Sequence, residues 1–148
     1  MSSYRQDAHL GYLLKHVQLR FFELGAVALA PLGINGREAA VLRAIGAGRP
    51  VSQGDIARAM NVDRTTMVAL IDDLQLKGLV QRRQDLDDRR RNVVELTDVG
   101  RGTARQAAEA VERAERDFLA PLSAAQTAQF KKFLRVLLDD AERPDASG

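Results

Sequence analysis

The chain of 148 residues contains no cysteine. It therefore forms no disulfide bond, offers no thiolate nucleophile and carries no cysteine redox switch. Histidine is scarce too, since His9 and His16 are the only two and both lie near the N-terminus. Two histidines without cysteine or a nearby carboxylate triad do not complete a metal site, so we expect neither a metal nor a cofactor.

The common enzyme motifs are also missing. The sequence has no glycine-rich phosphate-binding loop and no G-x-S-x-G nucleophile motif. Together with the missing cysteine and the scarcity of histidine, these absences give an enzymatic function little support. We therefore expect that the chain is not an enzyme.

Long hydrophobic runs do not occur. The longest nearly apolar stretch, "LGAVALAPLGI" from Leu24 to Ile34, is too short to span a bilayer. The N-terminal residues "MSSYRQDAH" lack the basic and then apolar layout of a signal peptide. We therefore expect a cytoplasmic protein with no membrane partner.

The residues that are present have the balance of a soluble folded protein. Hydrophobic residues make up 45% of the chain and charged residues 28%, which is ordinary for a domain that folds around a core. The net charge is only +2, so charge is informative about partners only where it is clustered.

Apolar residues recur with helical spacing in the N-terminal part of the chain. Over residues 10–29 they follow the i, i+3, i+4, i+7 pattern of an amphipathic helix, which would be about 30 Å long. The segment "PLGIN" interrupts this pattern, and Asn35 is a good N-cap for a second helix over about 36–47. Ser52 is an equally good N-cap for a third helix.

A fourth helix follows the third after a very short turn. Asp63 can cap it, and it continues to Lys77, where Gly78 favours a left-handed stop. Because only "NV" separates the third helix from the Asp63 cap, the two helices form a helix-turn-helix. The segments "LVQRR" and "NVVEL" then flank a charged loop, as in a β-hairpin.

Two more helices follow the hairpin. Thr97 and Asp98 can cap a long helix that ends before Pro121, and Ser123 can open a last one. The predicted fold is mainly α with a small β-hairpin wing: a winged helix-turn-helix flanked by N- and C-terminal helices. We assign residues 1–34 to the N-terminal helix, 35–100 to the winged helix-turn-helix lobe, and 101–148 to the C-terminal helices and tail; the roles of these parts in dimerisation and DNA binding are argued below.

The segment from Val51 to Gly100 resembles the MarR family of bacterial winged helix-turn-helix transcription regulators. The most specific part is Asp88-Arg89-Arg90, followed by Val94-Glu95-Leu96-Thr97. The resemblance implies a homodimeric, sequence-specific DNA-binding regulator, such as a repressor that a small aromatic or phenolic effector releases from DNA. The family's peroxide-sensing branch works through a cysteine, so this chain does not belong to that branch. Leu86 departs from the family pattern, in which a proline often follows the first aspartate of the wing.

The outward face of the fourth helix carries the mixture of groups that reads bases in a major groove. Arginine can read guanine, hydroxyls can read several base edges, and small apolar groups can touch the thymine methyl. In the alternative interpretation the apolar residues are tolerated on the surface and the threonines only cap the helix. The predicted DNA-binding residues on this face are Arg64, Thr65, Thr66, Val68, Ala69 and Asp72.

The segment "RRQDLDDRRR", which runs from the end of the first strand through the loop, is basic on balance, since it has five arginines and three aspartates. Phosphates attract such a wing, and an arginine in a narrow minor groove gains from the negative potential there. Asp88 can hold the Arg90 guanidinium, which is how the family uses its matching pair. The alternative is a solvated loop with incidental ion pairs. The predicted DNA-binding residues of the wing are Arg82, Asp88, Arg89, Arg90 and Arg91.

Ser52 and Gln53, at the start of the third helix, are candidates for a phosphate contact through side chains and free backbone N–H groups. Plain helix capping explains Ser52 equally well. The apolar faces of the first and last two helices are longer than one small winged domain can cover. Burial against a second copy would give a C2 dimer, suited to a pseudo-palindromic operator in double-stranded DNA, although core packing within one chain can explain any single residue.

A possible effector site lies on the first helix, where Tyr12, His16 and Arg20 occur at helical spacing. Arg20 and His16 could pair with a carboxylate, and Tyr12 could stack on an aromatic ring. A purely structural role for these residues is the alternative. A non-specific architectural DNA-binding protein without an effector would also explain the basic wing, but it would not need Thr65, Val68 and Ala69 facing the groove.

Overall fold

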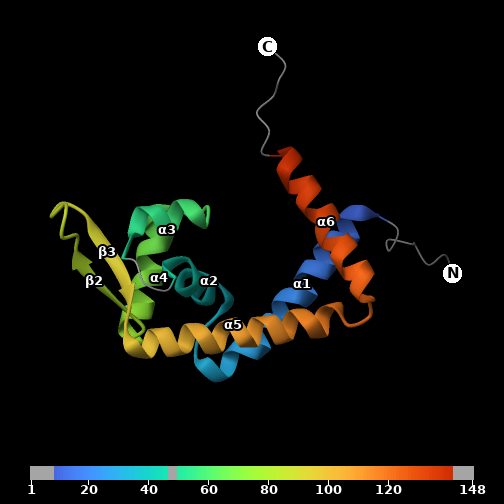
Figure 1. Ribbon diagram of the computed structural model, residues 1–148, viewed down its shortest axis with the longest axis horizontal. Coiled ribbons are helices and arrows are strands. Elements are labelled where there is room, and N and C mark those ends of the chain that lie inside the picture. The colour runs from blue at the N-terminus through green and yellow to red at the C-terminus, as the bar shows by residue number, and fades with distance from the viewer. Residues whose placement is uncertain (1–8, 47–49, 142–148) are drawn as a thin grey trace, which may run out of the picture.

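A computed structural model describes residues 9–46 and 50–141 of the chain (Figure 1). The chain begins with helix α1 (Leu10–Leu29), a short 3-10 helix η2 (Ala30–Leu32) and helix α2 (Gly36–Ile45). The predicted end of the second helix at residue 47 lies outside the described residues. The elements that follow are β1 (Val51–Ser52), α3 (Gln53–Ala59), α4 (Arg64–Leu76), β2 (Val80–Gln84), β3 (Asn92–Leu96), α5 (Asp98–Leu119) and α6 (Ala124–Ala141).

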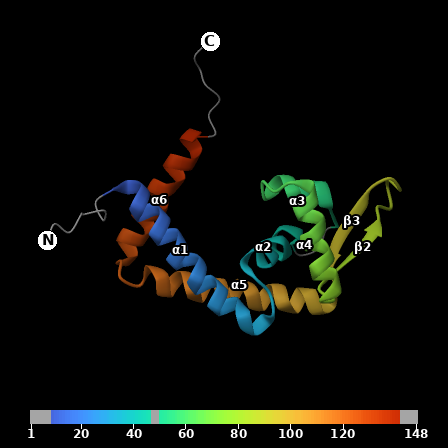
Figure 2. The same cartoon turned by 180° about the vertical axis from the view of Figure 1, so that it is seen from behind.

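The elements from α2 to β3 form a lobe at one end of the long helix α5 (Figures 1 and 2). Helix α1 lies along α5, and the Phe21 and Phe118 rings meet edge-on with centroids 5.2 Å apart. Beyond Ala120 the chain turns into α6, which rises away from the lobe. Because α5 is continuous from Asp98 to Leu119, the expected division at residues 100 and 101 falls within a single helix.

The helices begin where short polar side chains can accept hydrogen bonds from the first turn. Asn35 accepts from the Glu38 N–H at 2.9 Å, and the Glu38 carboxylate accepts from the Asn35 N–H at 2.9 Å, a complete capping box. The same kind of cap starts three other helices, which confirms these predicted N-caps: Ser52 for α3, Asp63 for α4 and Thr97 for α5.

The strands form a three-stranded antiparallel sheet in the order β1-β3-β2. The predicted hairpin is confirmed, with Val80 opposite Leu96 and Gln84 opposite Asn92. The third strand, β1, was not predicted, and it pairs with β3 through Val51 opposite Val94. This pairing places the N-terminus of α3 beside the wing, so α3, α4 and the hairpin form one surface.

The core of the lobe contains the buried face of α4 and residues from each neighbouring element. We call the helices outside the lobe, α1, α5 and α6, the arm helices. The core also extends to two of them, because Leu29 of α1 and Ala107 and Ala110 of α5 belong to the same buried cluster. Among the described glycines, Gly100 has the least room, since an added Cβ would lie 1.8 Å from the backbone oxygen of Leu79. A glycine is therefore required where α5 crosses the start of β2.

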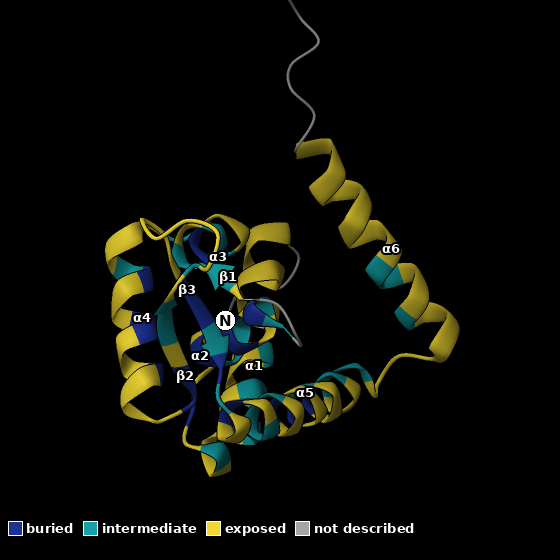
Figure 3. Cartoon of the chain, turned by 60° about the vertical axis from the view of Figure 1, so that its left-hand side comes forward, coloured by how far each residue is buried: buried dark blue, intermediate teal, exposed yellow. Residues whose placement is uncertain are grey.

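Helix α6 contains no buried residue in the single chain (Figure 3). The N-terminal half of α1 is exposed as well. Within the described residues, no single helix is long and apolar enough to cross a membrane. Only the segments Leu10–Leu32 and Gly36–Ile45 taken together reach that length and composition, and they bend by 73°. The exposed large apolar residues of the two helices are Leu10, Leu13, Leu14, Val17, Leu19, Phe22 and Val27 of α1, and Phe133, Leu134, Val136, Leu137 and Leu138 of α6.

Candidate nucleic-acid interface

Helix α4 turns its apolar stripe inward and its predicted reading face outward. Met67, Leu70, Ile71 and Leu74 are buried. The periodicity of the helix therefore leaves the other face to solvent. Five of the six candidate residues on that face are exposed, namely Arg64, Thr65, Val68, Ala69 and Asp72.

Thr66, the sixth candidate, is occupied within the helix cap. Its N–H donates to Asp63 Oδ1 at 2.7 Å, and its hydroxyl donates to Asp63 Oδ2 at 2.8 Å. These hydrogen bonds lower the pKa of the Asp63 carboxyl below its usual value. Thr66 therefore caps the helix in this structure, which is the alternative that the sequence left open, whereas the side chain of the neighbouring Thr65 is exposed.

Arg82 was predicted as a wing residue that faces phosphates, but its side chain instead bridges β2 to the helix-turn-helix. Its guanidinium lies 2.6 Å from the Asp72 carboxylate and donates to Gln75 Oε1 at 2.8 Å, both on α4. It also donates to Gln53 Oε1 of α3 at 3.3 Å and to the Val68 carbonyl at 3.4 Å. Arg82 therefore fixes the wing against both helices of the motif.

Hydrogen bonds from aspartates organise the tip of the wing. Asp85 Oδ1 accepts from the Asp87 N–H at 3.0 Å, and Asp88 Oδ1 accepts from the Arg90 N–H at 3.0 Å. These are Asx-turns, in which a side chain replaces a backbone acceptor. Asp88 was expected to hold the Arg90 guanidinium; in this structure its Oδ1 accepts from the Arg90 backbone N–H, and the described residues include no ion pair between the two. The acids of this basic loop thus shape its turn.

Two further wing arginines form ion pairs. Arg91 reaches Asp55 of α3 at 3.4 Å, and Arg83 pairs with Glu95 across the hairpin at 3.0 Å. Hydrogen bonding with Ser52, and then the nearby arginines, lowers the pKa of the Asp55 carboxyl. In the part of the chain that the structure describes, Arg64, Arg89 and Arg90 take part in no ion pair.

The start of α3 lies beside this surface but is partly engaged. The Ser52 hydroxyl accepts from the Asp55 N–H at 3.1 Å, which is the capping role expected as the alternative. Gln53 uses its side-chain oxygen to accept from Arg82, which leaves its amide N–H₂ able to donate outward. Two residues of this surface were not predicted from the sequence as site residues: Gln75, which accepts from Arg82, and Asp55, which pairs with Arg91.

The candidate effector residues lie on the exposed half of α1. The Tyr12 and His16 rings stack with centroids 3.8 Å apart. His16 Nδ1 lies 2.8 Å from the Tyr12 carbonyl oxygen, so this nitrogen carries the proton that is donated. Arg20 is exposed on the same helix. Within the described residues, no group of three or more His, Asp or Glu side chains could hold a metal ion.

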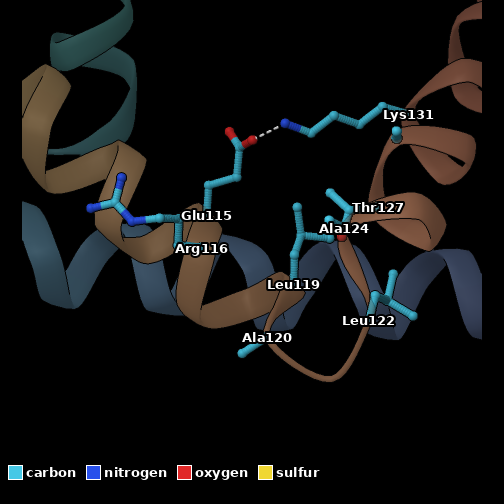
Figure 4. A pocket seen from close by; sticks show the side chains of 9 residues that line it. Glu115, Arg116, Leu119, Ala120, Leu122, Ala124, Thr127 and Lys131 are labelled. Atoms are coloured by element: carbon cyan, nitrogen blue, oxygen red, sulfur yellow. Dashed lines mark hydrogen bonds and ion pairs between the residues drawn. The ribbon is translucent and has the colours of Figure 1, made fainter.

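Two open cavities occur elsewhere on the arm helices. One, of about 490 Å³, lies at the elbow between α5 and α6 and is crossed by the ion pair of Glu115 with Lys131 (Figure 4). The other, of about 280 Å³, lies between α1 and α5 and is lined by Leu24, Val27 and Arg113 among others. Neither is lined by Tyr12, His16 or Arg20, so the single chain does not enclose the predicted effector residues in either cavity.

Known proteins are similar to this chain in sequence and in fold. Residues 32–91 match the model of the MarR family. An HTH-type transcriptional repressor of Mycobacterium tuberculosis (strain ATCC 25618 / H37Rv) is 33% identical over 134 residues, which cover 90% of this chain and 96% of that protein.

Solved structures agree with these sequence matches. The PcaV transcriptional regulator from Streptomyces coelicolor superposes with a TM-score of 0.79 at 29% identity, covering 91% of this chain and 98% of that one. A mutant of MarR from E. coli, complexed with operator DNA, has a TM-score of 0.80 at 24% identity, covering 93% of this chain and 99% of that one, and indicates a shared fold. The Mycobacterium protein is named as a transcriptional repressor and the Streptomyces protein as a transcriptional regulator, and the MarR mutant was solved with operator DNA.

Proposed function

The chain belongs to the MarR family of DNA-binding transcription regulators, which are not enzymes, and from this premise we propose that it is a homodimeric repressor of a pseudo-palindromic operator, released by a small aromatic or phenolic effector. The observation that carries the DNA-binding part is the combination of the exposed face of α4 with a braced wing. Arg64, Arg89 and Arg90 are the arginines left without ion pairs in the described part of this surface, and all three are exposed.

The surface divides into groups that suit base edges and groups that suit phosphates. Thr65, Val68 and Ala69 offer a hydroxyl and small apolar groups, which suit base edges in a major groove. Arg89 and Arg90 project from the wing tip, where an adjacent minor groove or its phosphates would meet them. Base readout by α4 and backbone binding by the wing together give a sequence-specific complex.

The dimer is supported by the faces that the single chain leaves uncovered. Helix α6 has no buried residue, although Phe133, Leu137 and Leu138 are large apolar side chains that are more than half exposed. A second copy related by a two-fold axis would bury these faces and place two α4 helices on successive turns of one side of the DNA. Leu137→Asp should therefore convert a dimer to a monomer in light scattering at micromolar concentration, and a wild-type monomer would refute this part.

The effector is supported by the chemistry of α1. Tyr12 presents an aromatic face that is already stacked on His16, and Arg20 presents a cation on the same exposed helix. An aromatic carboxylate or phenolate would match a stacking ring and a neighbouring cation. Benzoate and phenol are suitable first probes, since both should weaken operator binding by the wild type and act less on Arg20→Ala. A lack of response in the wild type to aromatic acids and phenols would refute an effector of this class.

One experiment tests the operator. Fragments of the source genome that the protein retains should be selected, and the affinity for the recovered site should be compared with that for a scrambled duplex at a stated salt concentration. A specific regulator should prefer its site by at least about 10³-fold. Equal affinity for both duplexes would instead indicate a non-specific architectural protein. Thr65→Ala and Val68→Ala should each lower the preference at particular base pairs, by about 1–3 kcal/mol.

A further inference from the structure

The C-terminal end of α4 is held by a polar contact that the DNA surface does not use. Lys77 directly follows the last residue of the helix. Its ammonium group donates to Glu38 Oε1 and Oε2, both at 2.8 Å, and to the Gly33 carbonyl at 2.9 Å. Because an ammonium group has three N–H donors, this arrangement accounts for all of them.

Glu38 is a buried carboxylate whose charge needs this partner. Its side chain is only 3% exposed, whereas that of Lys77 is 40% exposed. Among the described residues, Lys77 is the only cation in ion-pair contact with Glu38. The Asn35 N–H also donates to Glu38 Oε2 at 2.9 Å, so the capping box holds the carboxylate in place independently of Lys77. A buried charge that is fixed in place determines where its counter-charge must lie.

This contact ties the recognition helix to the turn that leads out of α1. Gly33 ends η2 with a left-handed φ of 68°, and Glu38 lies in the first turn of α2. One residue beyond Lys77, the Gly78 carbonyl accepts from the hydroxyl of Thr97, the N-cap of α5, at 2.6 Å. The same end of α4 is therefore attached to the turn between α1 and α2, to the first turn of α2 and to the N-cap of α5.

The opposite end of α4 carries the candidate reading groups, so a small rotation at Lys77 is amplified there. A helix of 13 residues is about 20 Å long, and a tilt of roughly 10° about one end moves the other end by about 3 Å. This displacement is as large as a hydrogen bond is long, and it would remove contacts of Thr65 or Val68 with base edges.

We propose that Lys77 and Glu38 are positioning residues for DNA readout, which set the tilt of α4 relative to α2 and the turn that leads out of α1, and through these elements relative to α5. The inference rests on the proposed function, because it concerns how the α4 surface is presented to DNA. The buried apolar stripe of α4 holds the helix on the lobe but is not directional. The Lys77 ammonium has three acceptors at fixed positions on Glu38 and Gly33, so it adds a directional contact at the C-terminal end of the helix, beside those that Arg82 makes with Asp72 and Gln75.

Two variants and one matched control test this role. Lys77→Met keeps the length of the stem and removes the three donors, and Glu38→Gln keeps an acceptor for the Asn35 N–H while removing the charge. Arg37→Met is the control, since it removes one positive charge from an exposed position next to Glu38. Should Lys77→Met fail to fold, Glu38→Gln carries the same test.

Each test variant should bind the operator about tenfold more weakly, the loss expected for roughly one base contact, while its affinity for a scrambled duplex stays within about twofold of wild type. Arg37→Met should weaken both duplexes alike. The unfolding temperature of each variant is measured as well, so that its binding assay is done at a temperature where the variant is folded. A purely structural role would lower only the unfolding temperature and would leave the operator preference of the folded protein unchanged.

A distance measurement reports the tilt without DNA. Because the chain has no cysteine, spin labels at Thr65→Cys and Gln106→Cys are the only ones attached, and an excess of unlabelled protein confines each measured pair to one chain. The distribution of label distances between α4 and α5 should shift or broaden in Glu38→Gln and stay unchanged in Arg37→Met.

The outcomes separate this inference from the function it rests on. Operator preference and label distances that both remain as in wild type in Glu38→Gln and Lys77→Met overturn the inference and leave the repressor intact. A wild-type protein that shows no preference for any site overturns the proposed function and, with it, the role of Lys77 in readout.

Discussion

Replacing Asp88 by two different residues separates the charge of the wing from its shape. Asp88→Asn and Asp88→Ala both remove one negative charge, so they change the attraction of the wing to phosphates equally. Asparagine keeps an Oδ1 acceptor for the Arg90 N–H, which Asp88 holds at 3.0 Å, and alanine does not. Any difference in DNA affinity between the two variants therefore reports on the Asx-turn.

The size of that difference follows from the hydrogen bond. A net contribution of about 0.5–1 kcal/mol suits a bond in this exposed loop, because water competes for both partners. This corresponds to a factor of about two to five in Kd. Asp88→Asn should bind DNA more tightly than wild type, since a repulsive charge is gone and the turn remains. Asp88→Ala should bind about two to five times more weakly than Asp88→Asn.

The assay is fluorescence anisotropy with operator and scrambled duplexes across a salt series. Salt screens the gain from the lost charge, so the advantage of Asp88→Asn over wild type should fade as salt rises. The ratio between the alanine and asparagine variants should persist, because both carry the same charge. Equal Kd values for the two variants at every salt concentration would refute the reasoning and leave Asp88 as a surface charge only.

Substitutions at three other sites test the packing at Gly100, the contacts of Arg82 and the helix cap at Asp63. Gly100→Ala should lower the free energy of unfolding by more than about 2 kcal/mol because its Cβ would meet a backbone carbonyl, whereas Gly102→Ala, which meets nothing within 4 Å, should raise it by about 0.5–1 kcal/mol in urea titrations. Arg82→Ala should lower it by about 1–2 kcal/mol. Arg82→Lys should not restore it, because Nε and a terminal nitrogen of the guanidinium reach Gln53 and Gln75 separately, and lysine has only one nitrogen; full restoration by lysine would contradict the bridging role. Hydrogen bonds from Thr66 lower the pKa of the Asp63 carboxyl below 3.8, so the stabilisation by the ionised cap is present above pH 3.8 and is lost as the pH falls through the lowered pKa. The difference in unfolding temperature between wild type and Asp63→Ala should therefore be smaller at about pH 2 than at about pH 7. A difference that stays constant over this range would refute the role of the charged cap.

Local chemistry explains why the helices could be predicted from the sequence. Asn35, Ser52, Asp63 and Thr97 each accept a hydrogen bond from the N–H three residues later, so the signal for a helix start lies within four residues of sequence. The outward face of α4 could be predicted for the same reason, since helical period alone decides which side chains face the core.

Contacts between distant segments could not be predicted in this way. Strand β1 has two residues, too few to show an alternating pattern, and it exists because Val51 meets Val94 across the sheet. Arg82 belongs by sequence to a charged loop, and its partners on α3 and α4 are revealed only when the chain folds. The ion pair of Lys77 with Glu38 joins residues 39 positions apart, and neither end carries a signal of the other.

The joint between β3 and α5 determines how this part of the molecule opens to solvent. Thr97 is the only residue between the strand and the helix, and its N–H donates to the Leu79 carbonyl at 3.1 Å. With no loop to absorb a displacement, the paired strands cannot separate at their base unless the first turn of α5 is also released. Amide hydrogens of β2, β3 and that turn should therefore exchange with solvent as one cooperative unit with a shared opening free energy, while those of the wing tip exchange faster and independently.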